Sequence, residues 1–236
     1  MDKKPKNDES EIDDGIERIN QESFHDLELE KEIMEECDKL IKKYFDDRKY
    51  VDSKVKIWGD ALLNDLEYFC KTKSKYIFCL SLRIDPKNFI PTYVARIQRR
   101  KKKDGNLDFK YKLPFLRLYF DILYIEKFSA KKKIYFDIKS FQNKMKNIIS
   151  NVIDERTYLK DKMKEYAKYI LDDSKKNINL ICDNFSYFTL CIMANIPKLT
   201  TLCIKTVNFT ENEFCFSINY STNEISCEIY YFIYNP

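Results

Sequence analysis

The feature that most constrains this chain is an internal repeat. The spacing of a tyrosine, a lysine and an aromatic residue in 50–58 recurs in 158–166, 108 residues later. A helix-length gap and then an aromatic, strand-like run follow each motif, at 75–80 and at 186–191. A third pair of matching runs, 115–125 and 225–235, closes the two copies. A period this long indicates duplicated domains rather than a solenoid, so one polypeptide can build a dimer by itself.

Both copies predict two helices followed by four strands. Apolar residues recur every three or four positions in the helices, and Asp26 is placed to cap the first one. Aromatic and branched residues then take over, with turn signals at Asp85-Pro86 and a predicted hairpin at Asp104-Gly105-Asn106. Such short connections favour an α+β fold with antiparallel sheets. The predicted helices are 29–44, 55–69, 141–152 and 163–171, and the predicted strands are 76–84, 92–98, 107–112, 115–125, 185–194, 199–208, 213–219 and 225–234.

Composition restricts the class of protein. Residues 1–23 are acidic and polar and predict a disordered tail, which leaves 24–126 and 127–236 as the two domains. The net charge of +4, from 42 basic and 38 acidic side chains, argues against a dedicated nucleic-acid binder. We expect no membrane interaction and a cytosolic location, because the chain has no long apolar run and no signal-peptide core at its start.

Candidate catalytic and metal-binding residues are few. His25 is the one histidine, the three glycines are isolated, and no His/Cys cluster has zinc spacing, so we expect no enzyme activity, metal or cofactor. The eight cysteines form no C-x-x-C motif and are predicted to be buried free thiols rather than a disulfide framework. The basic run 99–103 is predicted to be a solvated hairpin tip; nucleic-acid binding or nuclear localisation is the alternative.

The string Tyr50-Val51-Asp52-Ser53-Lys54-Val55-Lys56-Ile57-Trp58, followed after a helix by Lys75-Tyr76-Ile77, resembles the Tctex-type dynein light chains. The second copy keeps Tyr158, Lys162 and Tyr166 but lacks the tryptophan. Neither copy has the glycine-containing turn that precedes the family's second strand. That strand is exchanged between the subunits of family dimers, so the resemblance leaves open how strands are exchanged in this chain.

The resemblance implies two tandem Tctex-type domains, each with two helices followed by a four-stranded antiparallel sheet, that form a monomeric intramolecular pseudo-dimer. It further implies a non-catalytic dynein subunit in the cytoplasm, on the cytoskeleton or in the axoneme of a cilium. Its partners would be the dynein intermediate chain and other dynein light chains, bound by β-augmentation. The alternative is a dynein-independent cargo or cytoskeletal adaptor. The expected partner-binding residues lie on the second strand of each copy: Thr92, Tyr93, Val94, Arg96, Gln98, Thr200, Leu202, Ile204, Lys205 and Thr206.

Overall fold

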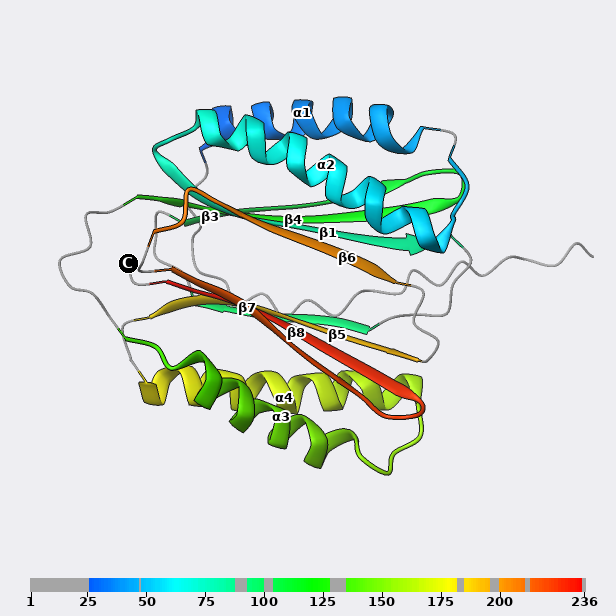
Figure 1. Cartoon of the computed structure of the whole chain (residues 1–236), viewed down its shortest axis with the longest axis vertical. Coiled ribbons are helices and arrows are strands. Elements are labelled where there is room, and N and C mark those ends of the chain that lie inside the picture. The colour runs from blue at the N-terminus through cyan, green and yellow to red at the C-terminus, as the bar shows by residue number, and fades with distance from the viewer. Residues whose placement is uncertain are drawn as a thin grey trace, which may run out of the picture.

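The protein consists of four layers: a pair of helices, two stacked antiparallel sheets and a second pair of helices (Figure 1). This computed structural model describes residues 26–46, 48–87, 93–99, 104–127, 135–181, 185–195, 200–210 and 213–234. The predicted α+β class and the predicted order of helices and strands are confirmed. The elements are α1 Leu27–Phe45, α2 Asp52–Thr72, β1 Tyr76–Pro86, β2 Tyr93–Arg99, β3 Asp104–Lys112, β4 Leu116–Glu126, α3 Ile138–Ile153, α4 Lys160–Ile181, β5 Ser186–Asn195, β6 Thr201–Val207, β7 Glu213–Ser221 and β8 Ile225–Tyr234.

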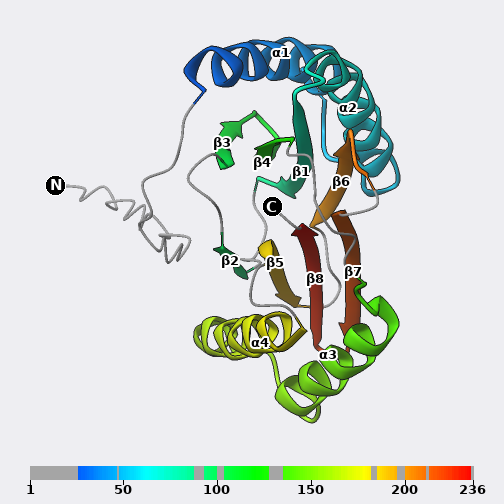
Figure 2. The ribbon, with the colours of Figure 1, turned by 90° about the vertical axis from the view of Figure 1, so that its left-hand side faces the viewer.

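The two halves exchange their second strands. One sheet has the order β3-β4-β1-β6 and the other has the order β2-β5-β8-β7. Strand β6 of the second half pairs with β1 from Ile84↔Thr201 to Phe78↔Val207, and β2 of the first half pairs with β5. Each sheet therefore contains three strands of one half and one strand of the other (Figure 2). Neither half completes a four-stranded sheet with its own strands.

Three apolar cores fill the spaces between the four layers. Successive side chains of a strand point to opposite faces, so Phe78 and Leu80 of β1 pack under α1 and α2, whereas Ile77 and Cys79 face the other sheet. An equivalent core lies under α3 and α4. The central core contains residues of both halves and holds the two sheets together. Its buried members are Ile77, Cys79, Leu123, Ile125, Phe188, Leu190, Ile192, Leu202, Phe232 and Tyr234.

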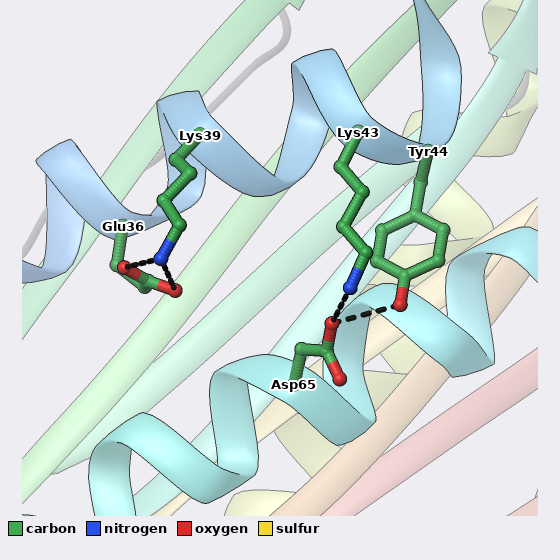
Figure 3. A network of polar contacts seen from close by, with 5 residues as sticks. All are labelled: Glu36, Lys39, Lys43, Tyr44 and Asp65. Carbon is green, nitrogen blue, oxygen red and sulfur yellow. Dashed lines mark hydrogen bonds and ion pairs between the residues drawn. The ribbon is translucent and has the colours of Figure 1, made fainter.

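Side-chain contacts fix the first helix at both ends. The predicted cap is confirmed, because Asp26 Oδ1 accepts a hydrogen bond from the Leu29 N–H at 3.1 Å. The other carboxylate oxygen of Asp26 accepts from the Tyr76 hydroxyl at 2.5 Å, and this bond lowers the pKa of Asp26. Near the other end, Lys43 and Tyr44 both donate to Asp65 of α2, at 2.7 and 2.8 Å (Figure 3). These bonds set the position of α1 against α2 and the sheet.

The predicted hairpin at residues 104–106 is wrong. These residues begin strand β3, and β2 and β3 belong to different sheets. Gly105 is required by a neighbouring ring and not by a turn, because a Cβ atom there would lie 1.8 Å from Cζ of Tyr124, the residue it pairs with on β4. Asp85 and Pro86 form the last two positions of β1, so the predicted turn begins later than expected.

The prediction of buried free thiols holds for six of the seven cysteines that the structure describes. Cys215 on β7 is the exception, because it is exposed. Cys182, His25 and the predicted tail all lie outside the described residues. Within the described ranges, no helix has the length and apolar character needed to cross a membrane.

Candidate functional site

The exchanged strands β2 and β6 lie at the edges of the two sheets. Among the described strands, β2 pairs only with β5, and β6 pairs only with β1. An edge strand presents a row of backbone N–H and C=O groups to which an extended peptide can add. The predicted partner-binding residues therefore lie on these two strands, although Thr92 falls outside the described residues. Tyr93, Val94, Arg96 and Gln98 are on β2, Leu202, Ile204, Lys205 and Thr206 are on β6, and Thr200 directly precedes β6.

A cavity of about 350 Å³ lies between the sheets beside β2. Its apolar walls include Val94 of β2 and Leu190 of β5, and its polar side chains other than Arg96 come from the opposite sheet. The cavity therefore adjoins the edge to which a peptide strand would add, and it can receive a side chain of such a peptide. The lining residues are Ser81, Arg83, Val94, Ala95, Arg96, Asp108, Phe109, Lys110, Tyr119, Phe120, Asp121 and Leu190.

Arg96 connects the two sheets across this cavity. Its guanidinium forms ion pairs with Asp108 of β3 and Asp121 of β4, and its side chain is only 8% exposed. Burial raises the pKa of the Asp121 carboxyl, and the charge of Arg96 opposes that rise. Arg96 therefore holds β2 over the sheet formed by β3 and β4, and its charge is already matched by two carboxylates.

A second buried cation, Arg83 of β1, also faces the cavity. The residue is 7% exposed, and its guanidinium lies 3.8 Å from the centre of the Tyr119 ring. Its Nε is 3.3 Å from Oδ2 of Asp85, and Lys110 lies 4.9 Å from the centre of the same tyrosine ring. Two cations therefore contact one aromatic ring at this wall of the cavity, and Asp85 balances the charge of Arg83. Sequence reasoning missed Arg83, although a charged residue within an otherwise apolar strand was a detectable signal.

The two edges differ in chemistry. When the run 75–80 is matched to 186–191, the sheet registers make Arg83 equivalent to Ala194 and Arg96 equivalent to Thr206. Beside β6 the main charged contact is instead a hydrogen bond of 2.6 Å from Lys205 to Glu67 of α2. This bond lowers the pKa of Glu67, and it anchors the exchanged strand to a helix of the other half. The two edges therefore have unequal surroundings.

The described residues include only part of the remaining predicted features. Arg99 ends β2, whereas residues 100–103 of the basic run lie outside the described residues. Within the described ranges, no group of three or more His, Cys, Asp or Glu side chains is arranged to hold a metal ion. Trp58 and Tyr166 are half-buried and pack against the cores under their helices.

Neither protein-family models nor curated protein sequences match this chain.

Proposed function

We propose that this chain is a tandem Tctex-type light chain, a non-catalytic subunit of a dynein motor that folds as an intramolecular pseudo-dimer. The observation that carries the proposal is the reciprocal exchange of β2 and β6 between the two sheets. In the family that 50–58 and 75–77 resemble, the second strand is exchanged between the two subunits of a dimer. A reciprocal exchange of the second strand occurs here within one polypeptide.

The proposed activity is the binding of extended segments of the dynein intermediate chain along β2 and β6. Backbone groups at these edges would supply the hydrogen bonds, and side chains beside the edges would select the sequence. The cavity beside β2 supports this proposal, because it opens next to the strand and combines apolar walls with the buried cation Arg83. The same proposal places the protein in the cytoplasm or in an axoneme, together with other dynein light chains.

Affinity purification of the tagged full-length chain from the cell that expresses it tests the proposal. We expect the dynein heavy and intermediate chains to be recovered. Val94→Asn and Ile204→Asn form a matched pair, because the two residues occupy equivalent positions on β2 and β6. Loss of the intermediate chain in either variant, with the fold intact by circular dichroism, would identify the edge that binds. Recovery of another complex without dynein would contradict the proposal and favour a dynein-independent adaptor.

A further inference from the structure

Cys215 and Cys79 form a pair of thiols that connects the two sheets. Strand β7 places Phe214 and Phe216 against the core under α3 and α4, so Cys215, which lies between them, points to the opposite face. On β1, Cys79 belongs to the central core between the sheets. The side chains of Cys79 and Cys215 interact there across the two sheets. Figure 2 shows β7 at the edge of its sheet, beneath β6, the strand that pairs with β1.

The two members of this pair differ in access to solvent. Cys215 is exposed, whereas Cys79 is 6% exposed. The interaction with Cys79 lowers the pKa of Cys215, and the pKa of Cys79 is raised by that interaction and by its burial. An exposed cysteine with a lowered pKa beside a buried second thiol is the arrangement found in peroxide-sensitive cysteine pairs.

A second pair in the same protein provides an internal comparison. Cys191 of β5 and Cys227 of β8 also interact through their thiols, but both are fully buried in the core under α3 and α4. The interaction with Cys227 and burial both raise the pKa of Cys191, which disfavours the reactive thiolate. An oxidant in solution therefore reaches Cys215 first and the pair Cys191 and Cys227 last.

We propose that Cys215 is an oxidation site at which peroxide forms a disulfide with Cys79 and joins the two sheets covalently. In the first step the Cys215 sulfur attacks hydrogen peroxide, which breaks the O–O bond and gives a sulfenic acid and one water. In the second step the Cys79 sulfur attacks that sulfenic acid, so the S–S bond forms and a second water leaves. Two thiols are oxidised and one peroxide is reduced to two waters. The product links β1 of the first half to β7 of the second half.

The test uses the full-length chain with Cys182→Ser, because Cys182 lies outside the described residues. Treatment with a small molar excess of hydrogen peroxide should lower the mass by two hydrogen atoms. Digestion without reductant should give one new linked peptide that contains Cys79 and Cys215, while Cys191 and Cys227 remain alkylatable. Dithiothreitol should restore both thiols. A disulfide between any other two cysteines, or a Cys215 that becomes sulfinic acid while Cys79 stays free, would overturn the proposal.

Two single variants in the same background separate the roles of the two thiols. In Cys79→Ser, the sulfenic acid on Cys215 has no resolving thiol, so a dimedone-type probe should label it and excess peroxide should drive it to sulfinic acid. In Cys215→Ser, Cys79 should stay reduced at the same peroxide dose because it is buried. Equal oxidation of Cys79 with and without Cys215 would contradict the assigned order. The peptide map of the parent protein decides the proposal even where a variant does not fold.

Discussion

Helix α2 approaches the exchanged strand β6 so closely that there is no room for a side chain at position 59, which is a glycine. A Cβ atom at Gly59 would lie 2.7 Å from Sγ of Cys203 on β6 and 2.9 Å from Cδ1 of Ile84 on β1. Both neighbours are fully buried, so they have little freedom to move away. Gly59→Ala gains about 1 kcal/mol of helix propensity. Overpacking of a well-packed core costs roughly 1–3 kcal/mol. We therefore expect a net loss of about 1 kcal/mol in the free energy of unfolding.

A double-mutant cycle isolates the contact between the two halves. Cys203→Ala removes the sulfur that the new methyl group would meet, so Gly59→Ala should be tolerated better in that background. We expect a favourable coupling free energy of about 1 kcal/mol, measured by urea unfolding with unchanged m-values. The matched control is Ala167→Gly, at the equivalent position of α4, which should destabilise the protein. Additive effects, or a Gly59→Ala protein that gains the full helix propensity, would refute the close approach of α2 to β6.

Two further predictions concern charged contacts, and urea unfolding at neutral and acidic pH measures both. Glu67→Gln should cost about 0.5–1 kcal/mol at neutral pH. Because the pKa of Glu67 is lowered in the folded protein, the stabilisation by its carboxylate is fully present above the unfolded pKa of about 4.3. This stabilisation disappears as pH falls through the pKa of the folded state. A loss of stability in Glu67→Gln that does not depend on pH would contradict this. Arg96→Met should cost about 3 kcal/mol at neutral pH, because it leaves Asp121 without its counter-charge. That loss should shrink on acidification, since burial raises the pKa of Asp121 and protonation removes the unpaired charge; a loss that persists at low pH would contradict the ion-pair argument.

The helices and strands were predictable because their signals are local. The stripe of α1, its cap at Asp26 and the aromatic runs of β1 and β5 depend only on neighbouring residues. The exchange of β2 and β6 has no such signal. The alternation of side chains in β2 is the same whether the strand adds to the sheet of its own half or to the other sheet. Only contacts between residues that are distant in sequence therefore determine which sheet β2 joins. Gly105 was misassigned for a similar reason, because the Tyr124 ring that requires it is distant in sequence.

The candidate site was predictable in position but not in chemistry. Placing the partner-binding residues on the second strand of each copy located both sheet edges. The cavity beside β2 needed the structure, since its walls come from five strands of both halves. Arg96 was expected to face a partner, yet its side chain pairs with Asp108 and Asp121 between the sheets. A sequence shows that a cation lies on an edge strand, but the stacking of the sheets decides whether solvent or two carboxylates surround it.

Closure of the strand exchange within one chain has a consequence for assembly. Strands β2 and β6 each pair with a strand of the same chain, so folding does not require a second chain. The covalent connection gives each half an effective concentration of the other of roughly millimolar. We therefore expect a single species of 28.5 kDa by light scattering and a Tm that stays constant over a hundredfold range of protein concentration. If the same strands were exchanged between two chains, the mass would double and the Tm would rise with concentration. A stable dimer at nanomolar concentration would therefore refute the closed pseudo-dimer.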